Sequence, residues 1–412
     1  MPPDPVAGFL VLLEHHFVAG AVGAFEPGSF GHWYAAGTQV LGDRITVQPV
    51  GEVWRSLGCR VSDSVWQTVA PSGAAGQRGM TPVEGQMMTD DATPHDLADW
   101  QGARYRPGSR RGHYESWFLR ANHPARNFAF WIRYTIFVPH DRPQDAIGEL
   151  WAIYFDGERK QIRAAKSETP IRDCHFVPRG LDVRIASATL ETGSLRGSAS
   201  GPHHIRWALT YRDGGTPMIF LPERTYEARL PKAKALCTRP GVVFDGTLEV
   251  DGESIAIDGW IGSENHNWGS KHTDTYAWGQ VVGFDDAPEA FLECATARLK
   301  LGPFWTPPMT IVCLRFDGQD YRLNSWRQMF RARGAWQDCD WRFDSAGAGV
   351  RIRGHMRAAP EDFVSLTYYN PPGGTHTCLN SKLAACEVTL ERRGEPPVTL
   401  TTRHRAAFEI LT

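Results

Sequence analysis

The chain has 412 residues, 44 lysines and arginines against 46 aspartates and glutamates, and a formal net charge of −2 at pH 7. This balance argues against a protein whose main role is to bind nucleic acid phosphates or anionic lipid. No run approaches the roughly 20 apolar residues of a membrane-spanning helix, and no export signal precedes the first apolar stretch, so we expect a cytoplasmic protein without an integral membrane segment.

The first part of the chain, residues 1–103, differs in composition from the rest. It is rich in glycine, alanine, proline and serine, and its apolar patches are short and without a sustained period. Such a segment buries too little apolar surface to offset the entropy of ordering it. We therefore predict an irregular N-terminal extension.

From residue 104 onward the pattern is that of β-strands. Apolar side chains alternate over 128–138, which predicts one long strand, and about fifteen strand candidates follow, separated by turn signals such as Asp156-Gly157 and Asp251-Gly252. No segment has ten or more residues of helical period. Strands joined by tight turns must close or stack to hide their edges, so we predict an all-β architecture of antiparallel sheets.

The second part of the chain also has a rough internal symmetry. A long aromatic-rich strand is expected near residue 130 and another near residue 280, and each is followed by an acidic strand. We expect two related domains, over residues 104–268 and 269–412.

Metal and cofactor motifs are missing from the sequence. The eight cysteines form no CxxC pair, and we expect them to be reduced thiols. His266 and His272 lie six residues apart, but no third ligand follows at a recognisable spacing. Glycine-rich phosphate loops and a GxSxG elbow are absent. We therefore predict neither a metal site nor a cofactor.

Three segments combine polar groups with aromatic residues: 112–120, 148–152 and 258–279. The motifs in them are Tyr114-Glu115-Ser116-Trp117-Phe118, His266-Asn267-Trp268-Gly269 and Tyr276-Ala277-Trp278-Gly279. Together with the crossing segment around Lys232 and Lys234, they resemble the superfamily of carotenoid 1,2-hydratase (hydroxyneurosporene synthase), tocopherol cyclase and AttH-like lipocalin-related proteins. The resemblance covers residues 104–412, and the N-terminal hundred residues match nothing in it.

The resemblance implies a fold and a class of reaction. The fold would be two lipocalin-like antiparallel β-barrels packed against each other. The catalytic members protonate a double bond in an isoprenoid so that water or a phenol oxygen can add. The partner would then be a hydrophobic small molecule bound in a barrel cavity.

The residues themselves indicate which groups could perform such a reaction. Protonating an alkene needs a carboxylic acid that burial keeps neutral, and flat π-faces to stabilise a carbocation. Glu115, beside Tyr114 and Trp117, fits this demand, and Glu149 and Glu293 are alternatives of the same kind. His266 is a candidate general acid or base. The predicted substrate-binding residues are Tyr114, Trp117, Trp151, Asn267, Trp268, Tyr276, Trp278 and Glu293.

Other interpretations stay open at this point. Glu115 could form an ion pair with Arg120 or Arg133 inside a barrel, and His266 could be a structural histidine. A non-catalytic carrier of a lipid or pigment would place all three glutamates outside the cavity or pair them with cations. A glycan-binding protein would need two carboxylates facing each other across an open groove.

Overall fold

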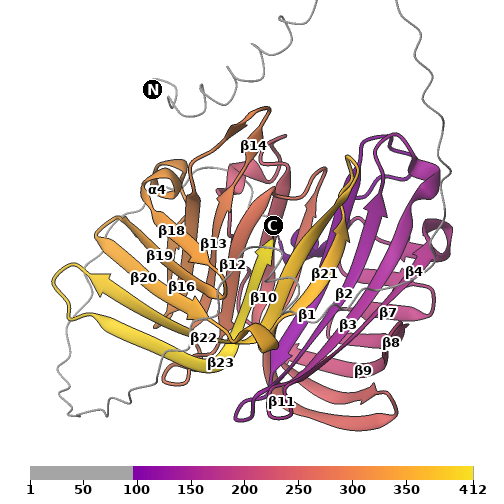
Figure 1. Cartoon of the computed structure of the whole chain (residues 1–412), viewed down its shortest axis with the longest axis horizontal. Coiled ribbons are helices and arrows are strands. Elements are labelled where there is room, and N and C mark those ends of the chain that lie inside the picture. Colours follow the sequence, from indigo (N-terminus) through magenta and orange to yellow (C-terminus); the bar gives the residue numbers. More distant parts are fainter. Residues whose placement is uncertain (1–95, 412) are drawn as a thin grey trace, which may run out of the picture.

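The computed structural model describes residues 96–411, and most of them belong to two large antiparallel sheets (Figure 1). Residues 1–95, most of the predicted irregular extension, lie outside the described residues. The end of that extension differs from the prediction, because Leu97–Gln101 form the short helix α3. A capping box between Asp96 and Asp99 satisfies the first backbone N–H groups of this helix.

Eleven strands form the first sheet, in the order β4-β3-β2-β1-β11-β10-β9-β8-β7-β6-β5. The sheet curls until β4 meets β8, where the Ser200 backbone N–H donates to Ser167 Oγ at 2.9 Å, and it nearly closes into a barrel. The strands are β1 (His113–Asn122), β2 (Phe128–Val138), β3 (Ile147–Asp156), β4 (Gln161–Pro170), β5 (Cys174–Phe176), β6 (Asp182–Ile185), β7 (Ala188–Glu191), β8 (Ser194–Ser200), β9 (His204–Asp213), β10 (Ala233–Val250) and β11 (Glu253–Gly269).

The second sheet has the order β17-β16-β13-β12-β23-β22-β20-β19-β18, with β21 also paired to β22. In both sheets the first strand pairs with the last, β1 with β11 and β12 with β23. The strands are β12 (Thr275–Val282), β13 (Phe291–Arg298), β16 (Met309–Phe316), β17 (Gln319–Leu323), β18 (Arg333–Gln337), β19 (Asp340–Gly347), β20 (Val350–Arg357), β21 (Val364–Tyr369), β22 (Thr375–Arg392) and β23 (Val398–Leu411).

Short elements connect these strands. The ribbon of β14 (Lys300–Leu301) and β15 (Phe304–Trp305) follows β13, and helix α4 (Trp326–Arg331) follows β17. Single 3-10 turns lie at Pro143–Asp145, Ile171–Asp173, Glu223–Thr225 and Pro360–Asp362.

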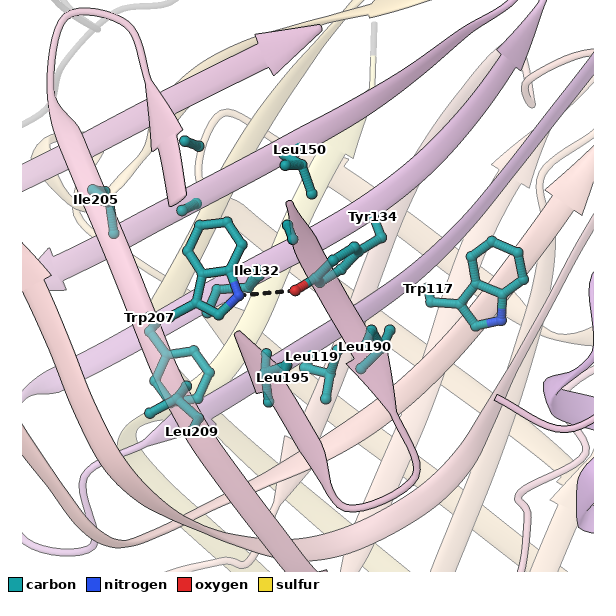
Figure 2. Close-up of a cluster of buried hydrophobic side chains, with 14 of the residues drawn as sticks. Trp117, Leu119, Ile132, Tyr134, Leu150, Leu190, Leu195, Ile205, Trp207 and Leu209 are labelled. Atoms are coloured by element: carbon teal, nitrogen blue, oxygen red, sulfur yellow. Dashed lines mark hydrogen bonds between the residues drawn. The ribbon is translucent and has the colours of Figure 1, made fainter. Parts of the chain in front are cut away.

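The apolar side chains form three main layers. One fills the first barrel and includes Trp117, Tyr134 and Trp207 (Figure 2). A second fills the second barrel around Trp341 and Phe408. The third lies between the barrels and contains side chains of both sheets, among them Phe118, Trp131, Trp151, Trp278, Phe291 and Leu411.

The alternation of side chains along each strand separates these layers. In β1, Trp117 and Leu119 point into the first barrel, whereas Phe118 points toward the second sheet. The observed β2 has the predicted bounds. The all-β prediction of two packed lipocalin-like barrels is confirmed.

We expect Tyr134→Phe to destabilise the first barrel. The Tyr134 hydroxyl accepts a hydrogen bond from the Trp207 indole N–H at 2.8 Å and donates to the Thr189 carbonyl at 2.8 Å (Figure 2). Its loss leaves a buried N–H unpaired, which should lower the free energy of unfolding by about 1–3 kcal/mol. Urea denaturation followed by circular dichroism measures the change.

Tyr321→Phe is the matched control, because the Tyr321 hydroxyl bonds the partly exposed groups of Gln319 and Arg392. Its partners stay in contact with water, so a smaller loss is expected. Equal stabilities for the two variants would contradict the role given to the pair of Tyr134 and Trp207.

Candidate functional site

A cavity of about 210 Å³ lies between the two barrels rather than inside one of them. The expected ligand position was inside a barrel, whereas this cavity lies between the barrels, whose interiors each contain a cluster of buried apolar side chains. An apolar cavity of roughly 150 Å³ is enough to bind benzene, so this one holds at least a ring-sized group. Its polar lining consists of Tyr114, Arg133, Lys234, Asn267, His272, Thr273, Tyr276, Trp278, Glu293, Tyr368 and Glu409.

Glu293 brings a carboxyl group to the wall of this cavity. Glu293 lies on β13 directly opposite Gln280 of β12 and is 2% exposed. The Trp278 indole N–H donates to Oε1 at 3.2 Å, while Oε2 has no hydrogen-bond partner among the described residues. Burial raises the pKa of Glu293 to about 8, and the Trp278 hydrogen bond and the charge of Arg120 only partly oppose this rise. Glu293 is therefore a neutral carboxylic acid at pH 7.

Aromatic rings form the walls beside this acid. Phe118 on β1 contacts Trp278 edge to face, with ring centroids 6.1 Å apart, and Trp131 on β2 lies 6.4 Å from Phe118. Tyr276 of β12 also lines the cavity. These π-faces come from both sheets, so the cavity exists only where the barrels meet.

The cavity lining also includes the nitrogen-containing side chains of His272 and Arg133. His272 stacks on Tyr114 at 3.9 Å and lies 6.0 Å from Tyr368. Burial and the nearby charge of Arg133 lower the pKa of His272 to about 3, so its ring is neutral. The Arg133 guanidinium donates to Ser116 Oγ at 2.7 Å and lies 4.7 Å from the Tyr368 ring centroid.

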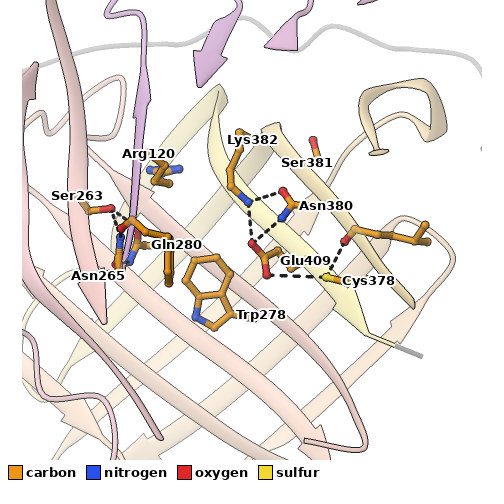
Figure 3. Close-up of polar contacts among 12 residues, drawn as sticks. Arg120, Ser263, Asn265, Trp278, Gln280, Cys378, Asn380, Ser381, Lys382 and Glu409 are labelled. Atoms are coloured by element: carbon orange, nitrogen blue, oxygen red, sulfur yellow. Dashed lines mark hydrogen bonds and ion pairs between the residues drawn. The ribbon is translucent and has the colours of Figure 1, made fainter. Parts of the chain in front are cut away.

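Glu409, which lines the cavity, belongs to a hydrogen-bonded network of buried charged groups (Figure 3). Lys382 Nζ lies 2.8 Å from Glu409 Oε1, and the Asn380 amide donates to the same oxygen at 2.9 Å. Arg120 is 1% exposed and points its guanidinium toward the Arg405 carbonyl oxygen at 3.4 Å. Burial lowers the pKa of Arg120 to about 10, so it remains a cation at pH 7.

A second ring of bonds ties the two sheets together directly (Figure 3). The Gln280 amide of β12 donates to Asn265 Oδ1 at 2.7 Å, and the Ser263 hydroxyl donates to Gln280 Oε1 at 2.7 Å. The Asn265 amide closes the ring by donating to Ser263 Oγ at 2.9 Å. This ring fixes β11 against β12, and hence the strand that carries Trp278.

Glu115 and His266 lie elsewhere, at the end of the first barrel. Glu115 accepts from His266 Nε2 and His113 Nε2, each at 2.9 Å, and from the backbone N–H groups of Arg104 and Tyr105 at 2.7 and 2.9 Å. Burial alone would raise the pKa of Glu115, but these partners lower it to about 2. An acid for alkene protonation needs the opposite shift, so Glu115 does not meet the condition on which its predicted role rested.

His266 is held at both nitrogens. Nδ1 lies 2.7 Å from the Trp100 carbonyl oxygen and Nε2 lies 2.9 Å from Glu115 Oε1, so an oxygen acceptor faces each ring nitrogen. The ring also stacks on Trp117 at 4.8 Å. Glu115 and His266 thus hold α3 and the residues that follow it against β1 and β11. The partners of Glu115 are histidines and backbone N–H groups rather than Arg120 or Arg133.

The remaining predicted residues divide between the cavity and other contacts. Tyr114, Asn267, Tyr276, Trp278 and Glu293 line the cavity together. Glu149 pairs with Lys166 at 2.6 Å, and Trp151 packs edge to face on Tyr368 at 5.8 Å. The Trp117 indole donates to the Gln101 carbonyl oxygen, and Trp268 packs on Tyr226. Glu149, Trp117, Trp151 and Trp268 are not among the residues that line the cavity.

Several cavity residues were not predicted, notably Phe118, Trp131, Arg133 and Tyr368. The alternation of side chains along a strand could have identified Phe118, because Phe118 shares a strand face with Tyr114.

The described residues contain no cluster of three or more metal-ligating side chains. Within residues 96–411, no helix has the length and apolar character to cross a membrane.

We expect Glu115→Gln to cost about 3–5 kcal/mol of stability at pH 7, because it breaks the buried pair with His266 and leaves buried hydrogen-bond donors without their carboxylate acceptor. The folded pKa of about 2 lies below the ordinary value of 4.5, so the stabilisation is present above pH 4.5 and is lost as the pH falls toward 2. Urea denaturation at pH 7 and pH 3 should show the gap to wild type narrowing. Glu158→Gln, which breaks an exposed pair with Arg126, is the control and should change stability little. Wild-type stability of Glu115→Gln at pH 7 would refute this role.

Glu293→Gln should have the opposite effect. The folded pKa of about 8 lies above 4.5, so ionisation of Glu293 costs the folded state nothing below pH 4.5 and progressively more as the pH rises to 8. The amide removes this cost, which is roughly 1.4 kcal/mol per unit of pKa shift. Thermal melts should therefore show the variant to be more stable than wild type at pH 8 and about equal at pH 4.5. A variant that is less stable at both values would show that Glu293 is not a buried neutral acid.

Comparison with known proteins finds one group of related sequences and several solved structures of similar fold. No protein-family model matches the chain. The protein Rv0493c of Mycobacterium tuberculosis is 26% identical over 322 residues, which cover 77% of this chain and 91% of that protein. An AttH protein from Nitrosomonas europaea superposes with a TM-score of 0.50 at 13% identity, over 78% of this chain and 98% of that chain. Kievitone hydratase from Nectria haematococca gives a TM-score of 0.47 at 13% identity, over 77% and 92%. The chain thus shares its fold with the AttH structure, in agreement with the fold that the resemblance implied.

Proposed function

We propose that the protein is an enzyme that protonates a double bond of a hydrophobic small molecule held between its two barrels, leading to hydration or cyclisation without a cofactor. Glu293 is the acid. The observation that carries this proposal is a carboxyl group, 2% exposed and with its pKa raised to about 8, at the wall of an aromatic cavity. The acid role therefore belongs to Glu293 rather than to Glu115, Glu149 or His266.

The geometry divides the work between the two carboxyl oxygens. Oε1 accepts from the Trp278 N–H, so the proton resides on Oε2, which has no partner among the described residues. The π electrons of the double bond form a C–H bond with this proton, and the electron pair of the broken Oε2–H bond stays on Glu293 as a carboxylate. The neighbouring carbon becomes cationic, and the faces of Phe118, Trp131 and Trp278 stabilise it.

The reaction ends when an oxygen nucleophile adds to the cation. In hydration the nucleophile is water, and in cyclisation it is a hydroxyl group of the same molecule. Either oxygen loses a proton on addition, and the Glu293 carboxylate takes it up, which restores the neutral acid. The balance needs no oxidant, reductant or metal.

Cavity size and lining limit the substrate class. About 210 Å³ accepts a single ring or one branched isoprenoid-like unit rather than a whole polyene. Arg133, Asn267 and the neutral His272 offer hydrogen-bonding groups at the polar lining. We propose an amphipathic substrate that carries an oxygen function near its reacting double bond, with Tyr114, Asn267, Tyr276 and Trp278 in contact with it.

The carrier interpretation makes a different prediction about the acids. A carrier would leave no unpaired carboxyl group at its cavity. Glu115 is held by His113 and His266, and Glu149 is paired with Lys166, but Glu293 faces the cavity with an indole as its hydrogen-bond donor. This difference favours the enzyme over the carrier.

The test begins by identifying the ligand, through native mass spectrometry and solvent extraction of the purified protein. Turnover of that compound in D₂O should place one deuterium on carbon, because the transferred proton exchanges with solvent. Turnover should fall as the pH rises through about 8, where Glu293 ionises. Glu293→Gln should reduce turnover by about 100-fold or more, the usual range for losing a general acid.

Glu149→Gln is the matched control, since Glu149 is another buried glutamate but is paired with Lys166 and does not line the cavity. It should retain turnover. Full activity in Glu293→Gln, or product without carbon-bound deuterium, would rule out the proposed acid.

A further inference from the structure

Large exposed hydrophobic side chains gather on two segments that follow β13 and β17. Among the described residues these side chains are Leu301, Phe304, Trp305 and Phe330. Phe304 is 67% exposed and Trp305 is 43% exposed, whereas every other described aromatic residue except Phe330 is buried or partly buried. Exposed apolar groups that are this concentrated mark an interaction surface.

The first segment is the ribbon of β14 and β15. Its base is closed by the Thr306 backbone N–H, which donates to the Leu299 carbonyl oxygen at 2.9 Å, and by Thr306 Oγ1, which accepts from the Leu299 N–H at 2.9 Å. Gly302 turns the tip with φ +59°. The ribbon stands at the upper edge of the molecule in Figure 1, and Leu299 at its base lines the cavity.

The second segment is helix α4, which lies at the same edge (Figure 1). Its side chains divide by helical period. Trp326 and Met329 line the cavity, whereas Arg327, Phe330 and Arg331 are exposed. The ribbon and α4 therefore both border the cavity and present their aromatic tips outward.

The same surface is basic, although the whole chain has a net charge near zero. Residues 298–308 and 325–333 contain no aspartate or glutamate, and their exposed cations are Arg298, Lys300, Arg327, Arg331 and Arg333. The Arg298 guanidinium lies 5.3 Å from the Trp305 ring centroid and Lys300 Nζ lies 6.0 Å from it. The neighbouring carboxylate, Asp274, is engaged by Lys271 and by the Lys300 backbone N–H.

We infer that this surface, the ribbon with α4, docks on an anionic lipid bilayer and opens the cavity toward it. Tryptophan and phenylalanine at a tip, flanked by arginine and lysine, match the boundary between headgroups and acyl chains. A stable protein partner would need about 1,200–2,000 Å² of buried surface, which a ribbon of two-residue strands and a helix of six residues supply poorly. A bilayer also dissolves apolar molecules, and a protein docked through the ribbon and α4 would place its cavity, which Leu299, Trp326 and Met329 line, next to them.

The experiment is flotation of the full chain with vesicles. We expect binding to vesicles of equal parts phosphatidylcholine and phosphatidylglycerol at low salt, and about tenfold less binding to phosphatidylcholine alone or at high salt. The double variant Phe304→Ser with Trp305→Ser should lose about tenfold in binding to the anionic vesicles. Arg327→Glu with Arg331→Glu should abolish the preference for anionic lipid.

The controls separate docking from folding and from catalysis. Arg172→Glu with Arg196→Glu makes the same charge change at exposed positions of the first barrel. This variant should keep more of the wild-type preference for anionic vesicles than Arg327→Glu with Arg331→Glu. Glu293→Gln should bind vesicles as wild type does, so a failure of the proposed chemistry leaves this test intact. Circular dichroism should show that all variants are folded.

Three results would overturn the inference. The first is the absence of wild-type binding to anionic vesicles at low salt, and the second is binding that the serine substitutions leave unchanged. The third is a wild-type dimer in light scattering that the serine variants convert to a monomer, which would make the surface a contact between two copies of the chain.

Discussion

Packing two β-barrels side by side requires the strands at their contact to bury both faces. Side chains alternate along a strand, so each residue of β1 belongs either to the interior of the first barrel or to the layer between the barrels. No face is left for water, and every polar side chain must find partners within its layer. The positions of Glu115 and Glu293 follow from this constraint, because one belongs to each layer.

The two glutamates show how the supply of donors decides the state of a buried carboxyl group. Glu115 receives four donors, and its pKa falls to about 2. Glu293 receives the Trp278 N–H, and its pKa rises to about 8. Both groups are buried to a similar extent, so burial alone does not distinguish a structural anion from a neutral acid.

Alternation in the sequence predicted much of the fold. It identified the strand over 128–138, and the same alternation in β1 places Trp117 in the first barrel and Tyr114 at the cavity. It could not tell which face meets the cavity, because both faces of β1 are apolar enough to be buried. The donors to Glu115 include the backbone of Arg104 and Tyr105, next to a segment with no periodic signal. That part of the site depends on tertiary contacts, which local pattern does not encode.

The candidate acid was also difficult to select from sequence because its donor is distant along the chain. Trp278 and Glu293 are fifteen residues apart and meet through the pairing of β12 with β13. The motif Tyr276-Ala277-Trp278-Gly279 identified Trp278 as a candidate binding residue, but it gave no reason to prefer Glu293 over Glu115 as the acid. The resemblance supplied the fold, whereas the choice among three glutamates required hydrogen-bond partners and burial.

The Trp278 hydrogen bond and, after it, the charge of Arg120 limit the rise in the pKa of Glu293. Burial makes an ionised Glu293 costly, and Arg120 reduces that cost without forming an ion pair with the acid, since its guanidinium points to the Arg405 carbonyl oxygen. A pKa near 8 then leaves Glu293 protonated at pH 7 and still able to give its proton away. A cation closer to Glu293 would lower its pKa and ionise it at pH 7, as the hydrogen bonds from His113 and His266 lower the pKa of Glu115. Without Arg120 the pKa of Glu293 would be higher still, and the acid would be weaker.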